Sequence, residues 1–235
     1  MTSAGRTRRI LDTLERQHPG ADTELHHRNA FELLVATLLS AQSTDERVNL
    51  VTPTLFQRFP DAASLAKATL QELEALIHST GFFRTKAKAL LGMAQQLVEE
   101  HGGGVPPDID RLTELPGVGR KTANVVLGHA LGVPGLPVDR HVLRVSNRIG
   151  IATSDDPVVV ERQLCRLLPK SRWTRASDTL ILHGRRVCRP LPLCDRCHVK
   201  DECRYYLGVG QRRPATRRAA APKRRADRDR VRRRA

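Results

Sequence analysis

The chain contains 235 residues, of which 40% are hydrophobic and 3% aromatic, and it carries a formal net charge of +15. This length predicts one large or two small domains, and the hydrophobic fraction is enough for a core. No run of about 18 apolar residues is present, which excludes a transmembrane helix. The amino terminus lacks the apolar stretch of a secretory signal, so we expect a soluble, cytoplasmic protein with no membrane partner.

The first predicted helices follow capping residues. Between residues 31 and 39, apolar side chains fall at i, i+3, i+4, i+7 and i+8, which is one face of a helix. Asn29, followed three residues later by Glu32, resembles a capping box at the start of this stripe. Thr69 and Glu72 repeat the pattern before a second stripe. These spacings predict two amphipathic helices.

Helical periodicity continues through the middle of the chain. Gly81 marks the end of the second stripe, as glycine commonly does after a helix. The later predicted helices cover residues 87–98, 108–114 and 120–131, and one more begins at Asp156-Pro157. No segment shows sustained two-residue alternation, so we predict an all-α fold.

The charge is concentrated at the carboxyl end of the chain. Residues 211–235 hold twelve basic and two acidic side chains, which places +10 in the last 25 positions. This segment offers almost nothing to bury, so we expect it to be disordered in isolation. Basic tails of this kind bind nucleic acid by neutralising phosphates, although a solvated tail and an address signal remain alternatives.

A glycine-rich turn at residues 115–121 lies between two predicted helices. Gly117 and Gly119 allow a tight turn with positive φ, and the N–H groups of the following helix start point outward, as in anion sites. Arg120 and Lys121 stand at this helix start, where the macrodipole disfavours cations. A phosphate would resolve that conflict, whereas solvated surface cations are the simpler interpretation. Asp139 precedes another helix and is most simply its N-cap.

Five of the chain's motifs together resemble the endonuclease III family. They are LLSAQSTDERVN (38–49), LPGVGRKTANVVL (115–127), PVDRHVLRVSNR (137–148), LILHGRRVC (180–188) and four cysteines between 188 and 203. The family comprises bifunctional DNA glycosylases and AP lyases of the helix-hairpin-helix superfamily. The resemblance covers residues 1–208 in the expected order.

The resemblance implies two helical domains flanking an active-site cleft. A six-helix domain with the helix-hairpin-helix motif would span residues 23–133. An iron–sulfur cluster domain would join residues 1–22 to 134–210, and residues 211–235 would form the disordered basic tail. The expected partner is damaged double-stranded DNA, bound by a monomer associated with the bacterial nucleoid.

The resemblance also assigns the chemistry. Lys121 matches the family's nucleophile and Asp139 its catalytic carboxylate. The lysine amine would attack C1′, displace an oxidised pyrimidine, and form a Schiff base that cleaves the strand by β-elimination. The carboxylate would stabilise positive charge on the sugar and assist proton transfer.

Further residues match positions that contact DNA in the family. Gln42 and Phe82 occupy the plug and wedge positions that fill the stack when a base is flipped out. The alternative for Phe82 is a buried aromatic that closes a helix. The hairpin residues expected to contact the DNA backbone are Gly117, Val118, Gly119 and Arg120.

Cys188, Cys194, Cys197 and Cys203 have the spacing C-x5-C-x2-C-x5-C. Four thiolates suit either a structural zinc ion or an iron–sulfur cluster, and spacing alone does not decide between them. The resemblance implies a [4Fe–4S] cluster, although the family usually places six residues between the first two cysteines rather than five. Cys165 lies among leucines and is expected to be an inert core thiol.

Two other functions remain open at this point. One is a glycosylase of the adenine or mismatch branch of the superfamily, whose members typically lack a lysine at the position of Lys121. The other is a structure-specific DNA binder without catalysis, in which the hairpin and the tail supply only phosphate affinity.

Overall fold

A computed structural model describes residues 3–208, and every regular element within this range is helical. The predicted all-α fold is therefore confirmed. The helices are α1 (Ala4–Gln17), α2 (Ala30–Leu39), α3 (Asp45–Arg58), α4 (Ala62–Leu65), α5 (Leu70–Ile77), α6 (Phe83–His101), α7 (Ile109–Glu114), α8 (Arg120–Ala130), α9 (Arg140–Ile149), α10 (Pro157–Leu167) and α11 (Trp173–Arg186), with single 3₁₀ turns η1 (His78–Thr80), η2 (Lys170–Arg172), η3 (Cys194–Arg196) and η4 (Lys200–Glu202). None of these helices is long and apolar enough to span a membrane. The expectation of disorder for residues 211–235 falls outside the described residues.

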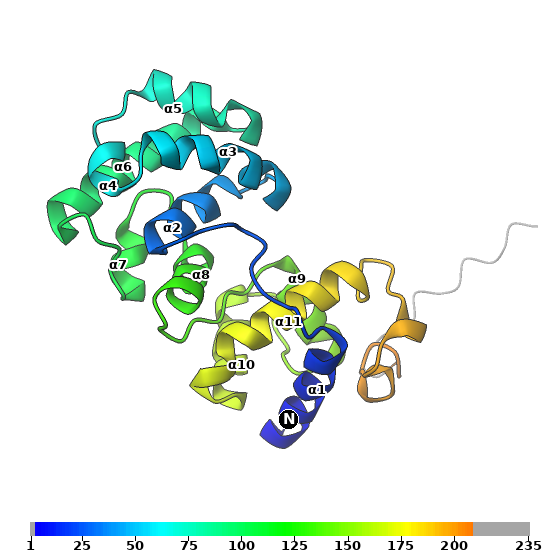
Figure 1. Cartoon of the computed structure of the whole chain (residues 1–235). Coiled ribbons are helices and arrows are strands. Elements are labelled where there is room, and N and C mark those ends of the chain that lie inside the picture. The colour runs from blue at the N-terminus through cyan, green and yellow to red at the C-terminus, as the bar shows by residue number, and fades with distance from the viewer. Residues whose placement is uncertain (1–2, 209–235) are drawn as a thin grey trace, which may run out of the picture.

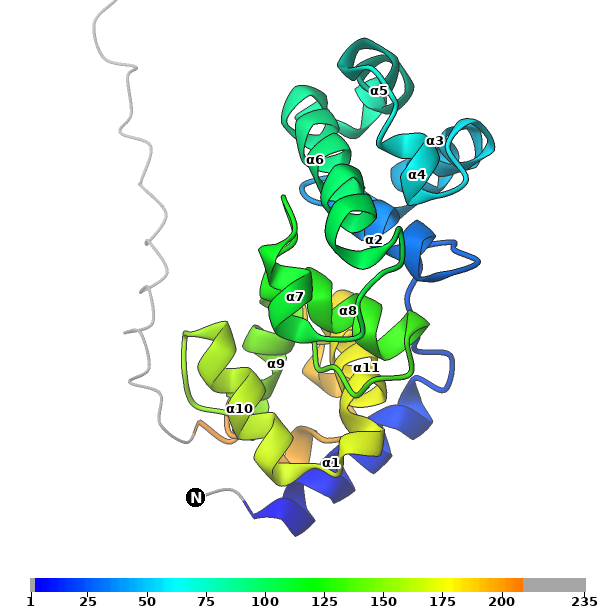
Figure 2. The same cartoon turned by 90° about the vertical axis from the view of Figure 1, so that its left-hand side faces the viewer.

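The helices gather around two separate apolar cores. One core contains buried side chains between Leu25 and Leu127, and the other joins apolar residues of α1 to buried side chains between Leu136 and Cys203. Figures 1 and 2 show α2–α6 at one end, α1 and α9–α11 at the other, and α7 and α8 between them. These cores support the expected division into residues 23–133 and 1–22 plus 134–210, which remains a proposal.

Local capping explains where several helices begin. The side chain of Asn29 accepts from the backbone N–H of Glu32 at 2.9 Å, but Glu32 turns to the backbone N–H of Arg28 at 2.7 Å. The predicted capping box at α2 is therefore wrong in one of its two bonds, because Glu32 does not accept from the N–H of Asn29. Its carboxylate instead accepts from the backbone N–H and the guanidinium of Arg28. At α5, Thr69 and Glu72 form the complete reciprocal box.

The predicted helix end at Gly81 and the predicted helix start at Asp156-Pro157 also occur in the structure. A 3₁₀ turn, η1, extends α5 to Thr80, and Gly81 then leaves the helix with a φ of 70°. Asp156 caps α10 by accepting from the N–H of Val158 at 2.8 Å, and Pro157 occupies the first helical position. These features depend on residues close in sequence, which is why the amino-acid pattern reveals them.

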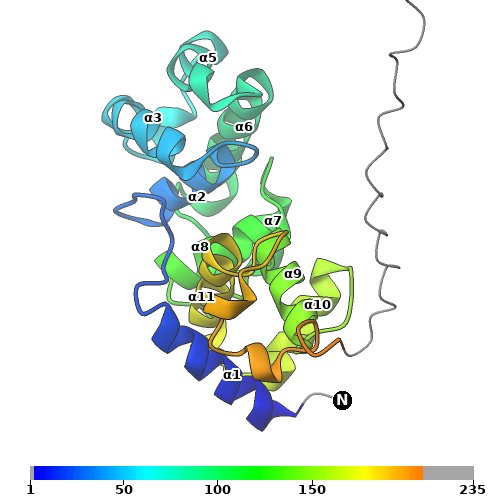
Figure 3. The same cartoon turned by 90° about the vertical axis from the view of Figure 1, so that its right-hand side faces the viewer.

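The chain crosses between the two cores before α2 and again after α8, so α8 borders both. A Cβ on Gly128 of α8 would lie 2.4 Å from the hydroxyl oxygen of Thr174, so glycine allows α8 to approach α11 closely. At the far end, Gln17 of α1 donates to the carbonyl of Arg196 at 2.7 Å, which ties the cysteine segment to α1 (Figure 3). The fold thus places one face of α8 opposite α11.

Candidate active site

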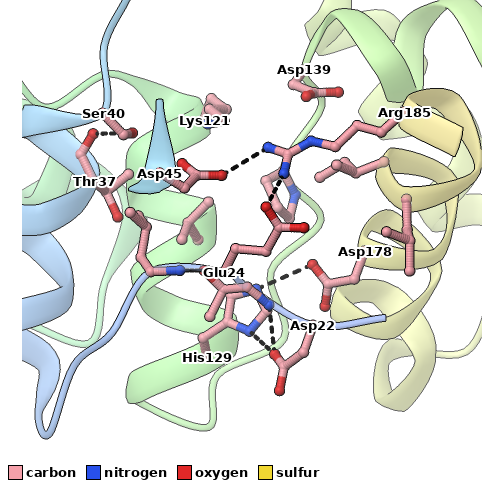
Figure 4. A pocket seen from close by; sticks show the side chains of 16 residues that line it. Asp22, Glu24, Thr37, Ser40, Asp45, Lys121, His129, Asp139, Asp178 and Arg185 are labelled. Atoms are coloured by element: carbon pink, nitrogen blue, oxygen red, sulfur yellow. Dashed lines mark hydrogen bonds and ion pairs between the residues drawn. The ribbon is translucent and has the colours of Figure 1, made fainter. Parts of the chain in front are cut away.

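Lys121 and Asp139 line the same cavity, which has a volume of about 80 Å³ and opens to solvent (Figure 4). Lys121 comes from the first turn of α8 and is exposed, while Asp139 is the residue before α9 and is half-buried. One wall is a stripe on α8 that runs from Lys121 through Val125 to His129, at spacing i, i+4, i+8. The facing wall comes from α11. The structure therefore brings together the two residues that the sequence predicts to be catalytic.

The turn before α8 uses its two glycines differently. Gly117 has a φ of 79°, and a Cβ there would lie 2.8 Å from the Cβ of Ala89. Gly119 has extended backbone with a φ of −89°, so the prediction of positive φ is correct for Gly117 and wrong for Gly119. Gly119 is the N-cap of α8 and provides no side-chain acceptor, which leaves the first N–H groups of the helix available to an anion. Val118 is buried, so its side chain is not available for the predicted contact with DNA.

The anion beside Arg120 is a protein carboxylate. Nε and Nη2 of Arg120 donate to the two carboxylate oxygens of Glu161 in α10 at 2.9 and 2.7 Å. Hydrogen bonding to Glu161 raises the pKa of Arg120 despite partial burial. The positive end of the α8 dipole disfavours the cation of Arg120, and the sequence suggested that a phosphate would offset this. The carboxylate of Glu161 in α10 already offsets part of it, through a contact between helices of the two cores.

Asp139 is the N-cap of α9, as predicted. Its Oδ1 accepts from the backbone N–H of His141 at 2.7 Å and of Val142 at 2.8 Å. Because both bonds use the same oxygen, Oδ2 is the atom that can face a substrate in the cavity. The cap therefore fixes the carboxylate without consuming it.

Gln42 and Phe82 lie on two neighbouring loops outside the cavity that holds Lys121. Both are exposed, and Phe82 keeps 65% of its surface accessible, so the alternative of a buried aromatic is wrong. They are also the two non-glycine residues with positive φ among residues 3–208, at 54° and 48°. Such a conformation costs about 1–3 kcal/mol per residue and marks positions where geometry matters more than local stability.

Arg185 of α11 is a residue of the site that the sequence patterns did not reveal. Its guanidinium donates to Glu24 at 2.5 Å and to Asp45 at 2.9 Å, and all three side chains line the cavity (Figure 4). Burial lowers the pKa of Arg185, but the hydrogen bond to Asp45 and the charges of Glu24 and Asp45 outweigh it and raise the pKa. Asp45 and Arg185 each lie within a quoted motif, which was the available signal, whereas Glu24 lies outside them. The network joins the segment before α2 and the start of α3 to α11.

His129 at the end of α8 is a second residue that the sequence did not reveal. Its Nδ1 lies 3.4 Å from Asp22 and its Nε2 lies 3.3 Å from Asp178 of α11 (Figure 4). Burial lowers the pKa of His129, but the hydrogen bond and charge of Asp178, with the charge of Asp22, raise it above its ordinary value. Ligand atoms of the three side chains lie within 4.8 Å of one another. Because each ring nitrogen faces a different carboxylate, we interpret the group as an imidazolium between two anions.

Lys86 of α6 is a third residue, after Arg185 and His129, that the sequence did not reveal. It is 5% exposed, and its Nζ donates to the carbonyls of Leu39 and Thr80, each at 2.8 Å. Burial lowers the pKa of this ammonium group. No carboxylate among residues 3–208 forms an ion pair with it, and a buried ammonium group that is held by carbonyls alone is costly, so this arrangement is unusual.

The four clustered cysteines line one small cavity beyond the end of α11. Arg148 of α9 donates to the sulfur of Cys188 at 3.6 Å, and the thiol of Cys203 donates to the carbonyl of Arg148 at 3.4 Å. The sulfur of Cys197 lies 3.6 Å from Nε2 of His183. The predicted ligand residues therefore converge, and all four are free cysteines.

The spacing of the sulfurs bears on the group they would hold. A tetrahedral zinc ion with Zn–S bonds of about 2.3 Å holds its sulfurs about 3.8 Å apart. Among the described residues, Asp22, His129 and Asp178 form the one group of three or more candidate ligands whose atoms all lie within 4.8 Å, and the cysteines do not form such a group. This wider arrangement of four thiols fits a four-iron cluster better than one zinc ion.

Cys165 lies apart from this cavity. It is half-buried in α10 and packs against the second core. Burial raises the pKa of the Cys165 thiol to about 12, so the thiolate form is scarce near neutrality. This agrees with the prediction of an inert core thiol.

The chain is similar to known DNA repair proteins. Residues 35–170 match the family described as HhH-GPD superfamily base excision DNA repair protein. The chain is 51% identical over 200 residues to endonuclease III of Synechocystis sp., covering 84% of this chain and 91% of the relative. It is 46% identical to endonuclease III of Bacillus subtilis over 196 residues, covering 83% and 90%.

Solved structures give the same result. A trapped covalent intermediate of endonuclease III with DNA matches with a TM-score of 0.83 and 41% identity, covering 90% of this chain and all of that chain. A non-covalent endonuclease III–DNA complex matches with the same score and identity, covering 88% and 98%. A thermostable thymine-DNA glycosylase, at 22% identity and a TM-score of 0.76, shares the fold.

Proposed function

The chain belongs to the endonuclease III family of the HhH-GPD superfamily, and from this premise we propose how its own residues carry out the reaction. It is a DNA glycosylase and AP lyase of base excision repair. The observation that carries the assignment of residues is the shared cavity, which holds a lysine at the start of α8 and a fixed carboxylate before α9.

Lys121 is the nucleophile of this reaction. Its amine, in the neutral form, bonds to C1′ of the damaged nucleotide as the bond from C1′ to the base breaks and the base leaves with the electron pair. The attached nitrogen loses a proton, and its lone pair then opens the sugar ring by breaking the bond from C1′ to O4′, which takes up a proton, so that a Schiff base forms. The Schiff base acidifies the C2′ proton, and loss of that proton breaks the bond from C3′ to oxygen and expels the 3′ phosphate by β-elimination. An exposed lysine in an open cavity can reach a nucleotide turned out of the duplex.

Asp139 stabilises the cation that develops on the sugar. Its Oδ1 is held by two backbone N–H groups of α9, so the carboxylate does not need to reorganise when charge appears. Oδ2 is then available to the sugar or to a proton in transit. A rigid cap and a catalytic group are thus combined in one side chain.

DNA would contact the hairpin and the two exposed loops. The free N–H groups around Gly119 suit a phosphate, and the exposed side chains of Gln42 and Phe82 suit the space left by a flipped base. Arg120 would contribute only through the part of its guanidinium that Glu161 leaves accessible. Oxidised pyrimidines are the proposed substrate class. The protein is proposed to act as a monomer.

Cys188, Cys194, Cys197 and Cys203 would hold a [4Fe–4S] cluster. Four thiols around one cavity, spread wider than a zinc tetrahedron, suit that group. Burial raises the pKa of Cys197 to about 11, so loading must displace protons from thiols. The group, when bound, supplies metal–thiolate bonds that tie the segment after α11 together.

Borohydride trapping on abasic DNA tests the assignment. Wild-type protein should form a covalent adduct, and Lys121→Gln should abolish both the adduct and strand cleavage while DNA binding persists. Lys88→Gln, which changes an exposed lysine of α6, is the matched control and should trap normally. Trapping by the Lys121→Gln variant would assign the nucleophile to another amine. A folded wild type that never traps would favour the non-catalytic binder.

A further inference from the structure

Lys86 connects the two exposed loops that carry Gln42 and Phe82. The first loop follows α2, and the second follows η1. The ammonium group of Lys86 donates to two backbone carbonyls. One belongs to Leu39, three residues before Gln42, and the other to Thr80, two residues before Phe82. The loops are distant in sequence, so this ammonium is a direct physical link between them.

The contacts hold each loop where its backbone leaves a helix. Leu39 is the last residue of α2, and its carbonyl lies at the negative end of the helix, where a cation is favourable. On the other side, the backbone N–H of Lys86 donates to the carbonyl of Phe82 at 3.1 Å, while the side chain holds Thr80. The turn that contains Gly81 is therefore fixed from both ends by one residue.

The two residues just beyond these anchors share a costly conformation. Gln42 and Phe82 are the non-glycine residues with positive φ in the described part of the chain, and both are exposed. Strained positions persist only where the surrounding structure holds them. Lys86 is buried, and within residues 3–208 it forms no ion pair with a carboxylate. The need to neutralise a buried negative charge therefore does not explain why a lysine is here.

We propose that Lys86 is a positioning residue that fixes the loops of Gln42 and Phe82 relative to each other and thereby sets the discrimination between damaged and intact duplex. The inference rests on the proposed function, in which those two side chains fill the space of a flipped base. Inserting two side chains into one gap requires a fixed distance between them, and a preorganised pair avoids the entropy of ordering both loops on binding.

Lys86→Met tests this, because methionine keeps an unbranched chain of similar length and removes the donors. Lys88→Met is the matched control, since Lys88 lies two residues away on α6 and is exposed. Both variants lose one positive charge, so a general loss of phosphate affinity affects them equally. Dissociation constants are measured for a duplex with a tetrahydrofuran abasic analogue and for the intact duplex, in the Lys121→Gln background so that catalysis does not enter.

We expect Lys86→Met to reduce the ratio of the two affinities about tenfold, which corresponds to about 1.4 kcal/mol, and Lys88→Met to leave the ratio unchanged. Adding Phe82→Ala to Lys86→Met should cause little further loss, because residues that act together are not additive. An unchanged ratio in folded Lys86→Met protein, or full additivity with Phe82→Ala, would overturn the proposal.

Thermal melts establish whether each variant folds. If Lys86→Met does not fold, Lys86→Gln, which can reach one carbonyl but not both, replaces it, and the same loss of ratio is expected. If neither variant folds, Lys86 serves the core itself and the positioning role is overturned. The proposed function fails separately, by absence of borohydride trapping in the wild type, and that result leaves the binding ratios measurable.

Discussion

The ion pairs of His129 lead to a prediction about stability and pH. His129 lies on the same face of α8 as Lys121. Its imidazole contacts Asp178 of α11 and Asp22, which lies between α1 and α2. The side chains of His129 and Asp178 are each 8% exposed, whereas that of Asp22 is 76% exposed. We therefore assign the stabilisation mainly to the pair with Asp178. The perturbation is His129→Gln.

The magnitude follows from the geometry of the pair. A hydrogen bond to a charged group contributes about 1.5–3 kcal/mol, and the separation of 3.3 Å places this one at the lower end. The exposed Asp22 adds little in solvent. The position of His129 in the last turn of α8 also favours the imidazolium through the helix dipole. For a chain of this size, about 1.5 kcal/mol corresponds to about 3–6 °C in melting temperature.

The sign of the pH dependence is set by the raised pKa of His129. A histidine whose pKa is higher in the folded than in the unfolded state stabilises fully below the unfolded value of about 6.5. That stabilisation is lost as the pH rises through the folded value. Lys170 and Arg175 line a cavity together with His129, but the charges that act on the ring are those of Asp178 and Asp22, which contact it.

The assay compares melting temperatures of wild type and His129→Gln at pH 5.5 and pH 9. The difference should be largest at pH 5.5 and should decrease as the pH rises through the folded pKa of His129, so that it is smaller at pH 9, while His26→Gln, at an exposed histidine, should show no difference at either pH. A constant difference, or a larger one at high pH, refutes the imidazolium. If Mn²⁺ raises the melting temperature of wild type at pH 8 but not that of His129→Gln, the group binds a cation instead.

Other predictions concern the remaining parts of the molecule. Asp139→Asn should keep the cap of α9 and change stability by less than about 1 kcal/mol, yet strongly slow base excision in single-turnover assays. Arg120→Gln should leave the carboxylate of Glu161 without its bidentate partner and lower stability by about 1–2 kcal/mol in chemical denaturation, after allowance for the half-exposed guanidinium. Anaerobically purified protein should contain about four irons per chain by metal analysis, and one zinc without iron would contradict the cluster. Removing residues 211–235 should flatten the slope of log K against log salt by roughly 3–4 units if about four basic side chains engage DNA, and an unchanged slope would mean that the tail does not contact DNA.

The features that the sequence predicted are those that depend on neighbours along the chain. The capping box of Thr69 and Glu72 spans three residues, and the cap by Asp139 spans two or three. Helix periodicity identified the faces that became the cores. These patterns need no knowledge of which helix contacts which, so they could be recognised before the structure.

The features that escaped prediction depend on distant partners. Arg120 and Glu161 are 41 positions apart, and nothing local in either indicates the other. Positive φ at Gln42 and Phe82 was also unpredictable, because both side chains normally avoid that region and only the surrounding packing holds them there. Lys86 looks in sequence like an ordinary helix lysine, and only its burial beside two helix ends reveals its role.

The shortened loop between Cys188 and Cys194 shows how a departure from the family pattern is accommodated. Arg148 of α9 donates to the carbonyls of Arg189 and Pro190, at 2.6 and 2.9 Å. Its guanidinium also stacks over the ring of Tyr205 at 4.7 Å.

One side chain therefore contacts both ends of the cysteine segment as well as the sulfur of Cys188. Two prolines already restrict this loop, so a single anchor on its backbone is enough to fix its course. Because Arg148 stands at the opposite end of α9 from Asp139, the same rigid helix orients the catalytic carboxylate and the cysteine loop. A missing residue in the loop consequently need not disturb the active site, since the position of Asp139 depends on α9 rather than on the loop.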